Sequence, residues 1–155
     1  MTSAAARLSD LGQSAWYDNL TREVATGGLD ELIRVHGISG VTSNPTIFQK
    51  AIQGSSDYDG QFAAEIARGL SPVQAYWELV VSDIHGALDA FSDLHAESDG
   101  EDGYVSLEVA PRLAYDIEQT VAEAKRLFTL VGAPNVLIKV PSTPKTHPHA
   151  QHTDA

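Results

Sequence analysis

Asn135-Val136-Leu137-Ile138-Lys139-Val140-Pro141-Ser142-Thr143 is the stretch that decides the fold. Its apolar run from Val136 to Val140 predicts a buried strand, and a single lysine interrupts that run. Burying an ammonium group is costly unless the group is paired or loses its proton. Lys139 is therefore either a strand-end lysine whose amine extends to the surface, which is common, or a lysine held for chemistry.

Strands and helices alternate on the N-terminal side of this stretch. Short strands are predicted near the residue ranges 14–19, 38–42 and 104–109, and helical patterns over 29–35, 46–94 (with breaks near 54–56 and 69–72) and 113–131. Such alternation indicates parallel βαβ units, which fit either an open doubly wound sheet or part of a (β/α)8 barrel. No glycine-rich nucleotide fingerprint or Walker-type phosphate loop follows any of the predicted strands.

The composition is that of a soluble globular domain of 155 residues, with 43% hydrophobic and 20% charged residues. Acidic residues outnumber basic ones by 21 to 10, which argues against a nucleic-acid binder. The absence of cysteine excludes disulfides and thiolate chemistry. Met1 to Asp10 lacks the apolar part of a signal peptide, and no run approaches about 18 apolar residues. We therefore expect a cytoplasmic protein that contacts no membrane.

Each of the four predicted strands ends near a polar residue of a type used in catalysis: Asp18, Asn44, Glu108 and Lys139. In parallel α/β architectures the carboxyl ends of the strands meet at one rim, where ligands bind. Asp18 is also explained as a turn residue, and Asn44 as the cap of the next helix. Glu108 is harder to explain structurally, because glutamate is disfavoured in strands and both of its neighbours are apolar.

This set of side chains supports one kind of chemistry. A lysine in an apolar setting loses its proton more readily, and its free amine forms a Schiff base with a ketone. The resulting iminium accepts electrons, so that the carbon–carbon bond two atoms away can break. One carboxylate exchanges the proton of the hydroxyl involved, while a second carboxylate and an amide orient water and substrate.

Several separated motifs resemble the transaldolase family, in particular its longer actinobacterial-type members. They are Trp16-Tyr17-Asp18-Asn19-Leu20, Gly40-Val41-Thr42-Ser43-Asn44-Pro45-Thr46-Ile47-Phe48, Val105-Ser106-Leu107-Glu108-Val109 and the stretch around Lys139. The resemblance implies a (β/α)8 barrel and a class I mechanism that uses no metal and no cofactor. It implies transfer of a dihydroxyacetone unit between sugar phosphates, from sedoheptulose 7-phosphate to glyceraldehyde 3-phosphate, in the pentose phosphate pathway.

The resemblance also implies roles for individual residues. Lys139 matches the Schiff-base lysine, Asp18 the general acid/base at the carbon–carbon bond, and Glu108 the carboxylate that acts through a water molecule. The substrate-binding positions are Asn44, Thr42 and Ser43. No metal site is expected.

The resemblance extends from about Leu8 to Thr143, so we expect a partial barrel domain over 1–143 and a polar tail over 144–155. A complete barrel needs roughly 250 residues, and the later strands that carry the phosphate clamp and the partner of the catalytic water are expected to be missing. The truncated chain is therefore expected to be weakly active or inactive. Three histidines in the tail (147, 149 and 152) are interpreted as part of a flexible polar segment rather than a metal cluster.

Four βα units leave two open sheet edges, and open edges favour association. Two alternatives to a transaldolase-like enzyme therefore stay open. One is a non-enzymatic remnant that only self-associates. The other is a small class I aldolase or lyase built on an open sheet.

Overall fold

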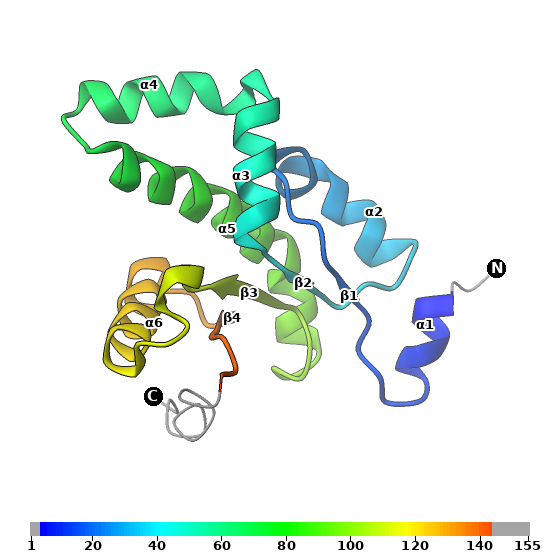
Figure 1. Cartoon of the computed structure of the whole chain (residues 1–155). Coiled ribbons are helices and arrows are strands. Elements are labelled where there is room, and N and C mark those ends of the chain that lie inside the picture. The colour runs from blue at the N-terminus through cyan, green and yellow to red at the C-terminus, as the bar shows by residue number, and fades with distance from the viewer. Residues whose placement is uncertain (1–3, 144–155) are drawn as a thin grey trace.

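Four parallel strands form the only sheet in the described part of the chain (Figure 1). The computed structural model describes residues 4–143. The strands are β1 (Trp16–Tyr17), β2 (Gly40–Thr42), β3 (Tyr104–Glu108) and β4 (Val136–Lys139), and their order in the sheet is their order in the chain. An open doubly wound sheet reverses its strand order at a switch point. The unreversed order found here therefore favours the barrel over the doubly wound alternative.

Helical segments fill every connection between the strands. They are a π-helical turn (Val24–Gly28), α2 (Leu29–Arg34), α3 (Pro45–Gly54), a 3-10 turn (Ser56–Tyr58), α4 (Asp59–Ala67), α5 (Pro72–Glu97), a second 3-10 turn (Pro111–Leu113) and α6 (Ile117–Val131). One more helix, α1 (Ala4–Ser9), precedes β1. Helix α4 lies alongside α5, and this hairpin extends beyond the sheet (Figure 1). None of the described helices is long and apolar enough to cross a membrane.

Local capping chemistry explains where the helices begin and end. Ser71 and Gln74 form a capping box at the start of α5, with Pro72 at the first helical position. Asp116 accepts a hydrogen bond from the backbone N–H of Gln119 and starts α6. Gly132 ends α6 in the left-handed conformation, with φ of 63°, which glycine adopts without a steric penalty. The helix breaks predicted near residues 54–56 and 69–72 are confirmed by the ends of α3 and α4 and the start of α5. All four predicted strands also form.

Three expectations about the helices are wrong in detail. Residues 1–10 have the composition of a polar, alanine-rich lead-in, but residues 4–9 form α1. The helix expected from Leu113 starts at Ile117, because Asp116 caps it there. The apolar pattern of residues 113–131 groups Phe128 on one face with Ala124 and Leu127, yet Phe128 is 44% exposed while the other two are buried.

The two faces of the sheet differ sharply in burial. Side chains alternate between the faces along each strand, and register partners lie on the same face. One face, carrying Val41, Val105 and Leu107, is buried against the helices, with α5 contributing residues such as Ile84 and Phe91 to the same core. We call the other the inner face; it carries Trp16, Gly40, Thr42, Tyr104, Ser106, Glu108, Leu137 and Lys139.

The inner face is only partly covered by the described residues. Leu137 is 44% exposed although it lies in the middle of β4. The expectation that β4 is a fully buried strand is therefore wrong for this side chain, because helices cover only the opposite face. Trp16 is 37% exposed, and its indole ring lies directly over Gly40, where a Cβ atom would come within 2.5 Å of the ring.

Candidate active site

Lys139 and Glu108 form an ion pair at the carboxyl ends of two neighbouring strands. The two residues are register partners on β4 and β3, so their side chains leave the sheet on the same face. Lys139 Nζ lies 3.1 Å from Glu108 Oε2. The lysine side chain is 41% exposed and the glutamate side chain 22% exposed, so a small molecule can reach the pair from the inner face.

Strand β2 and the residue that directly follows it supply the other two acceptors for the lysine. Lys139 Nζ donates to Thr42 Oγ1 at 3.3 Å and to the backbone carbonyl oxygen of Ser43 at 3.4 Å. An ammonium group has three N–H donors, and Glu108, Thr42 and Ser43 together match that number. Of the residues predicted from the sequence, the structure thus brings together Lys139, Glu108, Thr42 and Ser43.

Ser106 belongs to the same group and was not predicted. Its hydroxyl donates to Thr42 Oγ1 at 2.8 Å, and the residue is only 6% exposed. The sequence did carry a signal, since Ser106 lies two positions before Glu108 and therefore on the same face of β3.

Asn44 caps the N-terminus of helix α3. It adopts an extended conformation before Pro45, and its side chain accepts a hydrogen bond from the backbone N–H of Thr46 at 2.8 Å. Asn44 is therefore the N-cap of α3, as the helix-cap alternative from the sequence proposed. This bond engages the amide oxygen, and the amide nitrogen stays available as a donor.

Asp18 lies on the other side of the inner face from the lysine. It is exposed and directly follows β1, which is one edge of the sheet, while β4 is the other. Three strand spacings separate the two edges, roughly 14 Å along the sheet. The structure therefore does not bring Asp18 into contact with Lys139; the two groups flank the inner face from opposite edges.

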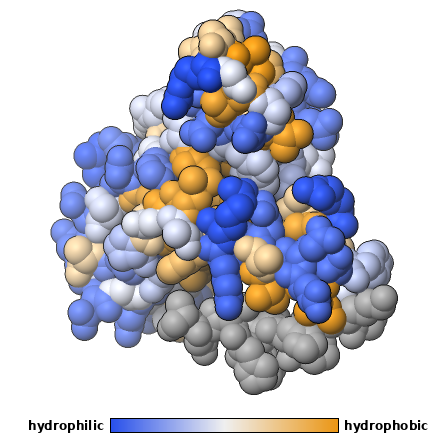
Figure 2. Space-filling model, turned by 90° about the vertical axis from the view of Figure 1, so that its left-hand side faces the viewer, coloured by the Kyte–Doolittle hydropathy of each residue, from blue (hydrophilic) through white to orange (hydrophobic). Residues whose placement is uncertain are grey.

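An apolar pocket adjoins the site on its helical side. It has a volume of about 200 Å³ and shares Ser43 and Glu108 with the lysine site. Its apolar lining includes Phe48, Tyr76 and Trp77. Figure 2 shows the face built from α4, α5 and α6, where hydrophobic side chains gather in separate clusters between hydrophilic ones.

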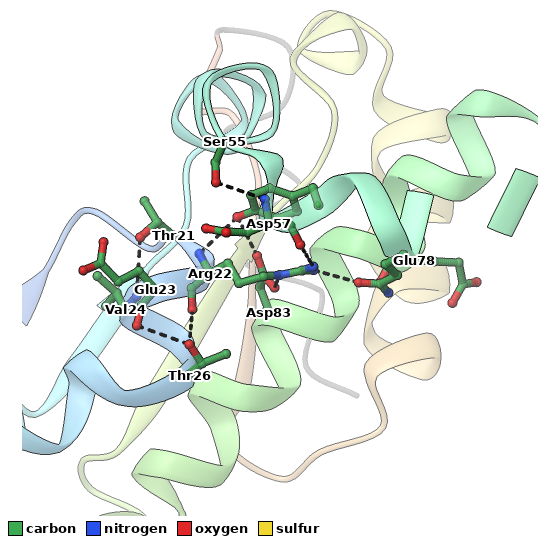
Figure 3. A network of polar contacts seen from close by, with 11 residues as sticks. Thr21, Arg22, Glu23, Val24, Thr26, Ser55, Asp57, Glu78 and Asp83 are labelled. Atoms are coloured by element: carbon green, nitrogen blue, oxygen red, sulfur yellow. Dashed lines mark hydrogen bonds and ion pairs between the residues drawn. The ribbon is translucent and has the colours of Figure 1, made fainter. Parts of the chain in front are cut away.

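A second polar cluster, centred on Arg22 and Asp83, fastens the segment after β1 to the helices (Figure 3). Arg22 Nε donates to Asp83 Oδ1 at 2.8 Å, and the Tyr58 hydroxyl donates to Asp83 Oδ2 at 2.9 Å. The Arg22 guanidinium also donates to the Asp57 carbonyl and to Gln61, and it lies 4.2 Å from the centre of the Tyr58 ring. One arginine thus ties three separate chain segments together.

Burial sets the protonation behaviour of this cluster. It raises the pKa of Asp83, although hydrogen bonds from Arg22 and Tyr58 act in the opposite direction. Burial and the hydrogen bond to the Asp83 carboxylate raise the pKa of Tyr58 to about 12. All of these polar groups have partners within the protein, so we assign the cluster a structural role.

Residues 4–143 contain no group of three or more histidine, cysteine, aspartate or glutamate side chains arranged to hold a metal ion. The tail over 144–155, including its three histidines, lies outside the described residues.

A family model described as transaldolase/fructose-6-phosphate aldolase matches residues 15–154. This chain belongs to that family. The match includes all four strands and continues past Thr143, so the domain boundary expected at that residue stays a prediction. The four strands are part of the (β/α)8 barrel of the transaldolase family, and the resemblance inferred from the sequence is confirmed.

Individual transaldolases resemble the chain closely over most of its length. The chain is 50% identical over 139 residues to "Transaldolase" of Thiobacillus denitrificans, which is 89% of this chain and 39% of the relative. It is 43% identical over 149 residues to "Transaldolase" of Trichodesmium erythraeum, which is 96% of this chain and 39% of the relative. For "Transaldolase" of Saccharopolyspora erythraea, identity is 49% over 137 residues. The chain thus spans about two fifths of the length of the curated relatives it matches.

Proposed function

We propose that Lys139 is the amine nucleophile of a transaldolase-type reaction. One observation carries the proposal. The amine lies at the carboxyl end of a barrel strand, 3.1 Å from the Glu108 carboxylate, and faces an accessible surface. Ligand and catalytic sites of (β/α)8 barrels gather at this end of the strands. Relatives that are 43% and 50% identical over most of the chain carry the name transaldolase, which supports the same chemistry here.

The reaction begins with attack of the Lys139 amine on the ketone carbon of a ketose phosphate. Loss of water from the adduct gives an iminium, and Glu108 assists this step by exchanging a proton with that water. Asp18 then removes the proton of the hydroxyl two carbons away. The carbon–carbon bond breaks, its electron pair moves to the iminium, and the aldose leaves while an enamine remains on Lys139.

The second half of the reaction reverses these steps with another aldehyde. The enamine attacks the acceptor, Asp18 returns the proton to the new hydroxyl, and water releases the product from Lys139. Thr42 and Ser43 support the amine between these steps, and the amide nitrogen of Asn44 donates to a substrate hydroxyl. With sedoheptulose 7-phosphate and glyceraldehyde 3-phosphate as substrates, the reaction belongs to the pentose phosphate pathway in the cytoplasm.

The 155 residues by themselves are proposed to catalyse this transfer weakly. They span about two fifths of the length of the curated relatives, so much of the relatives' barrel has no counterpart among them. In particular, no strand of the described residues lies beyond β4 to enclose a substrate bound at Lys139. Formation of the imine needs fewer groups than the complete transfer and is the step to test first.

Borohydride trapping tests the proposal. The chain is incubated with fructose 6-phosphate, reduced with borohydride and measured by intact mass spectrometry. A reduced adduct should form on the unmodified chain and on Lys125→Met, which removes an exposed lysine of α6, but not on Lys139→Met. Glu108→Gln should slow adduct formation by about a hundredfold, a typical contribution of general acid–base catalysis. A folded chain that gives no adduct would refute the proposal and leave the non-enzymatic alternative.

A class I aldolase would also form a trapped adduct with fructose 6-phosphate, so a second measurement must separate it from a transaldolase. The family description includes fructose-6-phosphate aldolase, which corresponds to the small class I aldolase considered from the sequence. An aldolase releases free dihydroxyacetone in the absence of an acceptor aldehyde, whereas a transaldolase retains the three-carbon unit on its lysine. Measuring free dihydroxyacetone with and without an acceptor separates the two.

A further inference from the structure

We propose that the apolar pocket beside the lysine site binds a small aromatic carboxylate, with the ring against the aromatic wall of the pocket and the carboxylate on Arg112. Every residue that lines the pocket lies between positions 43 and 112, on α3, on α5, on β3 or in the connections that follow β2 and β3. This binding needs no chemistry at Lys139 and is therefore independent of the proposed reaction.

The pocket has the size and the lining of a site for one aromatic ring. Its volume is about 200 Å³, and an apolar protein cavity of about 150 Å³ already binds benzene. Phe48, Tyr76 and Trp77 supply aromatic surface, while Val80 and Leu107 supply aliphatic surface. A single ring that carries one small polar substituent therefore matches this pocket.

The aromatic wall is held in place before any ligand binds. The rings of Tyr76 and Trp77 meet edge to face with their centres 5.6 Å apart. The guanidinium carbon of Arg126 lies 5.6 Å from the centre of the Trp77 ring, and Arg126 is itself fixed by two hydrogen bonds of 2.8 Å to Glu123. A wall that is already ordered loses little conformational freedom when a ligand binds, which favours binding.

The same wall carries two hydrogen-bond donors that the protein does not use. Within residues 4–143, neither the Tyr76 hydroxyl nor the Trp77 indole N–H forms a hydrogen bond with another residue. Burial raises the pKa of Tyr76, so its hydroxyl keeps its proton at neutral pH and stays a donor. A carboxylate has only acceptor oxygens, and these donors match it.

Arg112 supplies the positive charge at the pocket. It lies exposed in the 3-10 turn after β3, and the two nearby carboxylates are engaged elsewhere: Glu123 accepts from Arg126, and Glu108 pairs with Lys139. The hydrogen bond from Arg126 lowers the pKa of Glu123, and the charge of Arg112 adds to this effect. The Arg112 guanidinium forms no hydrogen bond or ion pair with another described residue. Because a guanidinium can bind a carboxylate through two parallel hydrogen bonds, Arg112 favours an anionic ligand.

A nuclear magnetic resonance titration with sodium benzoate tests the proposal. The chain has two tryptophans, so Trp16→Phe leaves the Trp77 indole N–H as the single indole signal. Benzoate should shift this signal until it saturates. Benzyl alcohol has the same ring without the charge and should bind about tenfold or more weakly, because it loses a hydrogen bond to a charged group. A benzoate titration that does not saturate, or benzyl alcohol that binds as tightly as benzoate, would overturn the proposal.

Substitution of Arg112 tests the anion contact. Arg112→Met should raise the dissociation constant of benzoate about tenfold or more, because the charged hydrogen bonds are lost. Arg34→Met is the matched control, since it removes an exposed arginine of α2 that does not line the pocket, and it should leave benzoate binding unchanged. Equal effects of the two variants would contradict the assignment of Arg112.

A second pair of variants tests the position of the pocket. Val73→Glu places a carboxylate in the lining of the pocket, within the first turn of α5, where an acidic residue is compatible with the helix. It should abolish benzoate binding through repulsion. Gln74→Glu adds the same charge at the next position, outside the lining, and can retain the capping box with Ser71, so benzoate should still bind. Undiminished binding to Val73→Glu would exclude this pocket as the site.

Discussion

Truncating Arg22 to alanine should destabilise the fold far more than the loss of a surface ion pair. The Asp83 side chain is only 2% exposed, and Arg22 Nε lies 2.8 Å from its carboxylate. Arg22 Nε and the Tyr58 hydroxyl both donate to the Asp83 carboxylate. Truncation of Arg22 leaves this buried negative charge with the Tyr58 hydroxyl, at 2.9 Å, as its donor from this pair. Removing one partner of a buried ion pair typically costs about 3–5 kcal/mol. The free energy of unfolding of a domain is about 5–15 kcal/mol, so this loss is a large part of it.

Urea unfolding followed by circular dichroism measures the effect, with linear extrapolation to water. Arg34→Ala is the control, because Arg34 and Asp30 form an exposed pair with an N–O distance of 3.8 Å, and such pairs contribute about 0.5 kcal/mol or less. The deficit of Arg22→Ala should shrink as the pH falls, because protonation of Asp83 removes the unpaired charge. A cost no greater than that of Arg34→Ala, or one independent of pH, would refute the assignment of Arg22 and Asp83 as a structural pair.

Variants at three further positions test local features by the same unfolding measurement. The pKa of Tyr58 is about 12 in the folded chain and about 10 when unfolded. The unfolded phenol therefore releases its proton first, and stability should fall by about 2–3 kcal/mol as the pH rises from about 10 to 12; Tyr58→Phe should remove this dependence. Asn44→Ala should cost about 1 kcal/mol through loss of the α3 cap, whereas Asn44→Ser should restore most of it. Gly132→Ala should cost about 1 kcal/mol because its φ of 63° disfavours a side chain, and a neutral substitution there would contradict the αL assignment.

The architecture could be predicted because it depends on local signals. Ser71-Pro72 and Gly132 mark helix ends through capping chemistry, and the structure has the helix boundaries at these residues. Alternation of strands and helices implied parallel pairing, but not the strand order. The strand order distinguishes a barrel from a doubly wound sheet. It depends on which strands lie next to each other in the folded chain, and the alternation of strands and helices does not determine this.

The site could be predicted in part. Lys139 and Glu108 were singled out because each is a charged residue in an apolar strand, and they meet because register pairs them. Ser106 was missed, because an uncharged serine stands out less in a strand than a lysine or a glutamate does. Its hydrogen bond to Thr42 follows from the register of β2 and β3, in which the two residues are partners. The Arg22–Asp83 pair was also missed, since the residues are 61 positions apart and belong to different elements.

The exposure of the inner face could not be predicted from the apolar pattern of β4. Val136 and Leu137 look alike in the sequence, yet Val136 is 3% exposed and Leu137 44% exposed. The difference arises because helices cover one face of the sheet only.

Peptide mapping of the borohydride-trapped chain tests the central claim most directly, because it identifies the lysine that carries the three-carbon or sugar adduct. The account predicts a reduced adduct on the peptide that contains Lys139, with none above background on the peptides that contain Lys50 or Lys125, both of which are exposed. An adduct spread evenly over the exposed lysines, with no preference for Lys139, would contradict it.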